Sequence, residues 1–201
     1  MGLYDLLFND EYINSNHFSP LNISREIWFA FLEEFSRWKD NDVYAISFFI
    51  DFDYDNQQDI RLYFGYNTET HYHNELCRNV EDIEIRWNYE FWLQNELFCF
   101  GEDGFTRNML QEWFRQQRIP ETQSVERLTE QLIYSVRDIH KSQILSHRFG
   151  KEIPVIIHNR YYYPDIATIN MEANGDCLEH EFITYCLKGK FDPEQMTSIS
   201  N

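Results

Sequence analysis

The chain has 201 residues, of which 43% are hydrophobic and 17% aromatic, and this composition excludes a disordered protein. Acidic side chains number 34 and basic ones 17, giving a formal net charge of −17, and the first 100 residues hold 19 of the acids and 6 of the bases. Nucleic acid and anionic membrane surfaces are normally bound through a basic footprint, so we expect neither as a partner. The acidic field favours solubility and would attract a basic protein.

Several features indicate a soluble cytoplasmic protein. The opening "MGLYDLLFNDEY" lacks the basic and apolar regions of a secretory signal, and no apolar run reaches the length of a membrane span. The four cysteines form no C-x-x-C pair, so we expect them to be reduced. We predict a single domain over residues 1–201, with a peripheral extension at 1–18 and a peripheral tail at 191–201. The sequence does not specify an oligomeric state.

The first third of the chain predicts a helix followed by two strands. Apolar residues three and four apart indicate an amphipathic helix over 20–39. The segment "VYAISFFIDF" at 43–52 is rich in β-forming residues and is typical of a buried strand, and "IRLYFGY" at 60–66 predicts a second strand.

The next segments are shorter and less regular. Asn-Thr followed by Glu69 indicates a helix start within 67–80. Alternating apolar and polar residues at 81–87 predict a half-exposed strand. The aromatic segment 88–101 fits either a helix or a strand.

The second half predicts helices around one more strand. Helices are expected at 104–118, at 121–150 with Gly150 beyond the end, at 164–175 with Pro at the first turn, and at 176–189 with Asp176 as the cap; "IPVIIH" at 153–158 is expected to be a buried strand. The order of elements predicts an α+β (mixed α/β) fold, with a small central sheet of about four to six strands covered by several helices.

The acidic run "DFDYDNQQD" at 51–59 is a candidate partner-binding edge. It lacks the Gly at position 6 and the Glu at position 12 of a calcium-binding EF-hand loop. Residues two apart on a strand share a face, so Asp51, Asp53 and Asp55 would line one edge, with Asp59 beyond them. The run predicts a solvated hairpin end that could also contact a basic partner.

Nothing in the sequence predicts a metal or cofactor site. His71 and His73 are spaced for one face of a strand but have no third ligand in a zinc pattern, and "EHE" at 179–181 is not a zinc motif. Glycine-rich phosphate-binding motifs and a G-x-S-x-G motif are absent from the sequence. We therefore expect no metal and no cofactor.

A histidine after the predicted strand at 153–158 supplies an alternative hypothesis, an enzyme of unrecognised type. His158 could act as a general acid or base with Tyr162 and Asp165 nearby in sequence. No Ser or Cys nucleophile stands beside it in the sequence. A neutral histidine bonded to backbone is the structural alternative.

A series of short motifs resembles a bacterial protein family defined only as a domain of unknown function. The motifs are "YAISFFIDFDYD" (44–55), "YNTET" (66–70), "RWNYEFW" (86–92), "FGKEIPVIIHNRYYYPDIA" (149–167), "AN" (173–174) and "EF" (181–182). Families of this kind often accompany polymorphic toxins, where small acidic proteins act as immunity proteins. The chain departs from the expected pattern at Asn159, where the resemblance implies an acidic residue. The resemblance supplies no catalytic residues.

Charge and resemblance together predict a bacterial immunity protein. It would neutralise a cognate basic toxin domain by occluding its active or substrate site, with no enzymatic activity of its own. The carboxylates expected to face the toxin are Asp51, Asp53, Asp55, Asp59, Glu81, Asp82 and Glu84.

Overall fold

The computed structural model describes residues 21–53, 55–159 and 165–188. Within these residues four strands form one mixed sheet in the order β3-β2-β1-β4. The strands are β1 (Val43–Phe52), β2 (Ile60–Thr68), β3 (Phe98–Phe100) and β4 (Val155–Asn159). β2 is antiparallel to β1 and to β3, and β4 is parallel to β1. The α+β prediction and the strands expected at 43–52, 60–66 and 153–158 are confirmed; the segments 1–18 and 191–201 lie outside the described residues.

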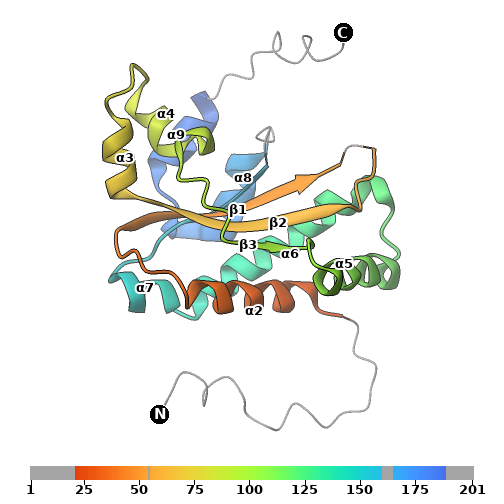
Figure 1. Cartoon of the computed structure of the whole chain (residues 1–201). Coiled ribbons are helices and arrows are strands. Elements are labelled where there is room, and N and C mark those ends of the chain that lie inside the picture. The colour runs from red at the N-terminus through yellow and green to blue at the C-terminus, as the bar shows by residue number, and fades with distance from the viewer. Residues whose placement is uncertain (1–20, 54, 160–164, 189–201) are drawn as a thin grey trace, which may run out of the picture.

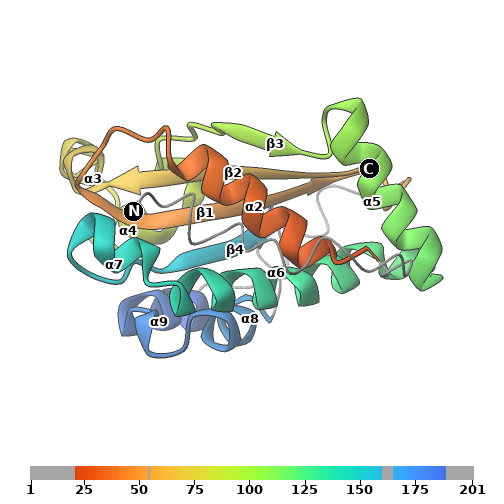
Figure 2. The same ribbon diagram turned by 90° about the horizontal axis from the view of Figure 1, so that it is seen from below.

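Helices cover both faces of the sheet (Figure 1). One layer contains α2 (Ile23–Phe35), α5 (Gly104–Gln117), α6 (Ser124–Lys141) and α7 (Ile144–Phe149), and Figure 2 shows α2 and α6 lying across the sheet from below. The other layer contains α3 (Glu69–Glu75), α4 (Asp82–Trp87) and α9 (His180–Lys188), and α8 (Ile166–Asn174) contacts both β4 and α6. Short 3-10 turns are η2 (Tyr89–Phe91), η3 (Glu121–Gln123) and η4 (Gly175–Cys177). No helix in the described ranges is long and apolar enough to cross a membrane.

The larger core lies between the sheet and the layer that contains α2 and α6. Alternate residues of β1, including Phe48, enter this core beside Phe31 of α2. The Phe31 ring centroid lies 5.4 Å from that of Phe48 and 5.8 Å from that of Phe64. Aromatic pairs at such distances each contribute about 0.5–1.5 kcal/mol beyond their burial. Helix α2 therefore docks through its predicted aromatic stripe.

A smaller core lies on the opposite face, under α4 and α9. An irregularity in the register between Val43 and Ala45 places Tyr44 and Ala45 together in this core, which also contains Trp87 and Phe182. The Trp87 and Phe182 rings meet edge to face at 5.4 Å. This core ties α4 and α9 to the start of β1.

Two asparagines of α8 cover the outer edge of β4. The side-chain amide of Asn170 accepts from the Ile157 N–H at 2.8 Å and donates to the Ile157 carbonyl at 2.9 Å. Asn174 makes the same pair of bonds to Val155, at 2.7 and 2.9 Å. Four residues of helix rise about 6.0 Å and two residues of strand about 6.6 Å, so the two asparagines match alternate strand residues. The outward backbone groups of Val155 and Ile157 are thus paired although no fifth strand lies beside β4 among the described residues.

The strand predicted at 81–87 is wrong, because these residues form α4. Ile83, Ile85 and Trp87 alternate with polar residues, but Ile83 and Trp87 are also four apart and share one face of a helix. Ile85 and Trp87 are buried, and α4 packs against α9. So short a segment fits both the helical and the strand period, and its packing against α9 selected the helix. The ambiguous segment 88–101 contains η2 and the edge strand β3.

Two helix boundaries and the setting of one histidine pair also differ from prediction. The expected helix at 121–150 is interrupted at Gln143, whose backbone is left-handed with φ of 56°, and α7 follows; Gly150 ends α7 with φ of 72°. The last helix begins at His180, and Asp176 lies in η4 instead of capping it. His71 and His73 lie on α3, not on a strand.

Candidate protein-interaction site

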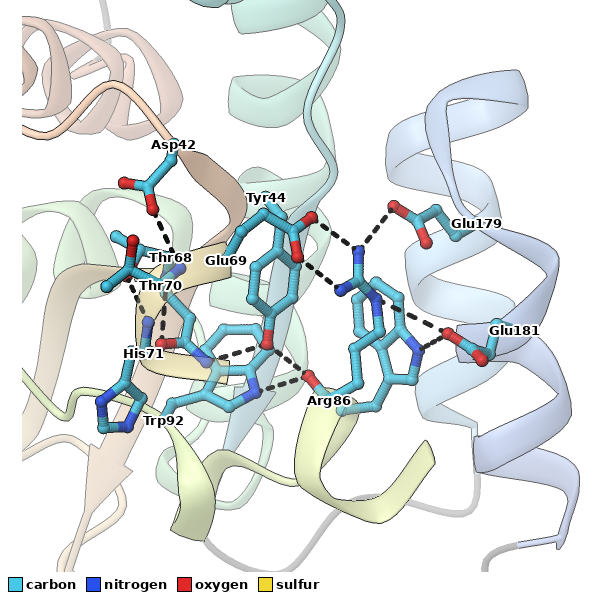
Figure 3. A network of polar contacts seen from close by, with 12 residues as sticks. Asp42, Tyr44, Thr68, Glu69, Thr70, His71, Arg86, Trp92, Glu179 and Glu181 are labelled. Carbon is cyan, nitrogen blue, oxygen red and sulfur yellow. Dashed lines mark hydrogen bonds and ion pairs between the residues drawn. The ribbon is translucent and has the colours of Figure 1, made fainter. Parts of the chain in front are cut away.

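Arg86 of α4 is surrounded by three carboxylates. Its guanidinium donates to both oxygens of Glu69 at 3.0 and 3.1 Å, and it lies 3.7 Å from Glu179 and 3.6 Å from Glu181 (Figure 3). The carboxylates come from α3, from the residue preceding α9, and from α9 itself. The neighbouring helices α3 and α4 and the distant start of α9 therefore meet at one cation, and we call these four residues the Arg86 cluster.

Aromatic rings line the inner side of the Arg86 guanidinium. Its central carbon lies 4.2 Å from the Tyr44 ring centroid and 5.0 Å from that of Tyr72. The Arg86 side chain is only 14% exposed. Burial opposes its charge, but the hydrogen bonds with Glu69 and the charges of Glu69 and Glu179 together outweigh burial and raise the pKa of Arg86. The same hydrogen bonds lower the pKa of Glu69.

Buried hydrogen bonds hold the backbone of Arg86 in place. Its carbonyl accepts from the Tyr44 hydroxyl at 2.7 Å and from the Trp92 indole N–H at 2.9 Å, and Asn67 donates to the Tyr44 hydroxyl at 2.8 Å (Figure 3). Burial raises the pKa of Tyr44, so the hydroxyl keeps its proton and remains a donor. The indole of Trp87 donates to Glu181 at 3.0 Å.

The start of α3 positions Glu69. Thr68 caps the helix by accepting from the His71 N–H at 3.1 Å. Asp42 accepts from the Thr70 N–H at 2.9 Å, and this contact with Thr70 lowers the pKa of Asp42. These contacts lie at the β2–α3 junction, which is the "YNTET" motif, and they hold Glu69 in place.

The Arg86 cluster carries excess negative charge at the surface. Its three carboxylates face one guanidinium, and the side chains of Glu69, Glu179 and Glu181 are 34%, 40% and 49% exposed. The charge of Lys151 also acts on Glu69, and the three carboxylates still outnumber these two cations. This is an arrangement that a lysine or arginine of another protein would complete.

The predicted partner-binding carboxylates fall into two separate groups. Glu81, Asp82 and Glu84 lie at the start of α4, on the same helix as Arg86; the first two are exposed, and Glu84 accepts from the Asn88 amide at 2.8 Å. Asp51, Asp53, Asp55 and Asp59 lie at the opposite end of the β1–β2 hairpin. The structure therefore brings the first group, but not the second, to the Arg86 cluster.

The run at 51–59 forms turns instead of a continuous acidic edge. Asp51 ends the strand region and lies 3.8 Å from Arg61. Asp53 has left the strand, and its carboxylate accepts from the Asp55 N–H at 2.8 Å. A second turn follows, closed by a hydrogen bond from the Asp59 N–H to the Asn56 carbonyl at 2.9 Å. Because the chain turns here, Asp51, Asp53 and Asp55 do not line one continuous strand face as expected.

His158 lies in a buried aromatic setting on β4. It is 1% exposed, its Nε2 lies 2.7 Å from the Ser47 hydroxyl, and its ring centroid lies 4.6 Å from that of Tyr89 and 5.4 Å from that of Phe49. Burial lowers the pKa of His158 to about 3. Ser47 could not be recognised as its neighbour from the sequence, because the pairing of β1 with β4 brings the two residues together.

The other residues of the enzyme hypothesis do not join this pair in the described structure. Asp165 is exposed at the start of α8, and Tyr162 lies outside the described residues. A neutral, buried imidazole with so low a pKa is a poor general base at neutral pH. The Ser47–His158 contact serves to satisfy two buried polar groups between strands.

The motifs are visible in the sequence, but the sequence does not show that their residues lie together in the fold. Tyr44, Glu69, Arg86 and Glu181 come from four of the quoted motifs, and they meet in the Arg86 cluster or against it. Arg86 and Glu181 each stand beside an aromatic residue, in "RW" and "EF", whereas Tyr44 and Glu69 are in no such pair. Nothing in the spacing showed that these pairs lie together.

Comparison with known proteins assigns no family: the chain matches no protein-family model, no curated protein and no solved structure.

Proposed function

We propose that this chain is an acidic protein-binding module of the immunity type, which neutralises a basic toxin domain by occluding its active or substrate site. The observation that carries the proposal is the Arg86 cluster, in which three partly exposed carboxylates are held around one guanidinium. The net charge of −17 would attract a basic partner over longer distance.

The cluster suits protein binding because its carboxylates are already held in place. Side chains that are ordered before binding lose less entropy in the complex. Glu69 is held by Arg86, and Glu181 by Arg86 and the Trp87 indole. A lysine or arginine of the partner would meet preformed acceptors instead of mobile ones.

The family resemblance supports the same surface. The motifs that carry it supply Glu69, Arg86 and Glu181 of the Arg86 cluster, but not Glu179, whereas His158 of the longest motif is buried beside Ser47. The departure at Asn159 falls on a buried residue of β4, away from this surface. Contacts around Arg86 do not depend on that position.

The experiment compares two double variants in partner capture and in protection of cells. The test variant is Glu179→Gln with Glu181→Gln, and the matched control is Glu112→Gln with Glu130→Gln on α5 and α6. Glu179 and Glu112 are both 40% exposed, and both variants change the net charge by the same amount. Wild type and control should retain a basic protein from the native host at low salt, and the test variant should retain at least about tenfold less.

The retained protein is then expressed alone and together with each version of the chain. If it is the toxin, expression alone stops growth, and wild type and control restore growth while the test variant does not. The proposal is wrong if the retained protein is harmless, or if both double variants restore growth as well as the wild type does.

A further inference from the structure

Three side chains with metal-binding atoms meet in a second group, which shares no residue with the Arg86 cluster. His140 ends α6, Glu152 precedes β4, and Cys177 lies in η4. One ligand atom from each lies within 4.8 Å of the other two, and all three residues are partly buried. Because they are widely separated in the sequence, no motif revealed them.

Asn174 determines which nitrogen of His140 faces the other two residues. The Asn174 carbonyl oxygen accepts from the Val155 N–H at 2.7 Å, and its amide nitrogen donates to the Val155 carbonyl at 2.9 Å and the Asn170 carbonyl at 3.0 Å. Reversing this amide would oppose donor to donor, so its orientation is determined. The same oxygen lies 3.0 Å from His140 Nε2, which must therefore carry a hydrogen and donate it.

This arrangement directs His140 Nδ1 at Glu152. Nδ1 lies 3.0 Å from the Glu152 carboxylate. With Nε2 already protonated, a neutral imidazole would place a lone pair against a carboxylate. The contact is favourable only if Nδ1 also carries a proton or if a cation lies between the two atoms. A histidine whose other nitrogen donates to a fixed oxygen is the usual arrangement behind a metal ligand.

The distances and atom types suit zinc. Zinc binds imidazole nitrogen, carboxylate oxygen and thiolate sulfur, and tetrahedral bonding places a nitrogen and an oxygen ligand about 3.4 Å apart. The observed His140–Glu152 separation is 3.0 Å, and the Cys177 sulfur lies within 4.8 Å of both ligand atoms. Small side-chain rotations of the partly exposed Glu152 and Cys177 would complete the geometry.

The charge around Cys177 also favours a cation. The carboxylates of Glu152 and Asp176 both act on Cys177. Their negative charge attracts a divalent ion, which in turn stabilises the thiolate.

We propose that His140 Nδ1, Glu152 and Cys177 bind one zinc ion, with water in the fourth position. On binding, the thiol proton and any proton on Nδ1 pass to solvent, and the three metal bonds replace the His140–Glu152 contact. The ion joins α6, the approach to β4 and η4, three segments that meet beside the asparagine-covered edge of the sheet. No residue is shared between this site and the Arg86 cluster, although Cys177 lies two residues before Glu179 of that cluster.

The test is a titration of the untagged, chelator-treated full chain with Co²⁺, followed by Zn²⁺. We expect one equivalent of Co²⁺ to produce a thiolate charge-transfer band and intense tetrahedral d–d bands, both abolished by one equivalent of Zn²⁺. Zn²⁺ should also raise the melting temperature, because it binds only the folded chain at this site.

Variants assign the site. Cys177→Ser should remove the thiolate band, Glu152→Gln should weaken Zn²⁺ binding at least about tenfold, and Cys77→Ser, at an exposed cysteine elsewhere, should change neither. Glu152 is 31% exposed at its side chain, so its variant is expected to fold, which circular dichroism checks. The proposal is overturned if wild type shows no thiolate band, if Cys77→Ser removes it, or if folded Glu152→Gln binds Zn²⁺ as tightly as wild type.

Discussion

His158 shows how one buried side chain can couple stability to pH. Its imidazole is 1% exposed and contacts the Ser47 hydroxyl, and burial lowers its pKa to about 3 from an ordinary value of 6.5. The folded chain therefore keeps this histidine neutral across the range in which an unfolded chain protonates it. The unfolded state binds the extra proton, so acid favours unfolding.

We expect this residue to make the free energy of unfolding fall as the pH drops from 6.5 toward 3. One proton contributes a slope of up to about 1.4 kcal/mol per pH unit, whereas above pH 6.5 it contributes none. His158→Gln, which retains an acceptor for Ser47, should flatten the wild-type slope between pH 6 and 5 by about that amount. Urea unfolding of both proteins across this range measures it, and parallel slopes would contradict the assignment.

Among the helices and strands, tertiary packing determined those whose type or boundary the sequence did not predict. The helix α2 follows from its apolar periodicity, and the strand β1 follows from its run of β-forming residues, because each is long enough to show its pattern. The short α4 was predicted as a strand, since six residues fit either period until α9 packs on it. The break at Gln143 has no glycine or proline to mark it. The Arg86 cluster was invisible for the same reason: its four residues are divided among three short segments, α3, α4 and the start of α9.

The pattern Asn-x-x-x-Asn of α8 is visible in the sequence. Its role, which is to pair with the backbone of the sheet edge, is visible only in the structure. Asn170 is fully buried and satisfies both outward backbone groups of Ile157. Without a fifth strand, these groups depend on the side-chain amide. The helix thus covers the edge of the sheet through polar contacts as well as through its apolar face.

Asn170→Ala should lower the free energy of unfolding by about 2–4 kcal/mol, because it leaves a buried N–H and a buried carbonyl without partners. Thr168→Ala, on the exposed side of the same helix, is the control and should change stability by less than about 0.5 kcal/mol. Chemical denaturation measures both variants. A loss below about 1 kcal/mol for Asn170→Ala would mean that water or another group replaces the amide.

For the whole molecule, the question is whether the acidity acts as a diffuse field or as a local contact. The formal net charge is −17, yet the two groups of predicted carboxylates lie at opposite ends of the β1–β2 hairpin. A field that steers a basic partner depends on all of them, because exposed charges act over about 8–10 Å at physiological salt and farther in dilute salt. Contacts in the complex, in contrast, depend only on the carboxylates that lie at the interface.

These two effects separate in the kinetics of binding to the captured partner. Asp53→Lys with Asp55→Lys and Glu179→Lys with Glu181→Lys each change the net charge by +4, so in dilute salt both should slow association, by about three- to tenfold. Only the second pair lies in the Arg86 cluster, so only that pair should also speed dissociation, by about tenfold or more. Surface plasmon resonance at two salt concentrations distinguishes the rates. Faster dissociation for the hairpin pair alone would place the partner at the turns of residues 51–59, and the cluster around Arg86 would then be a structural ion pair that joins α3, α4 and α9.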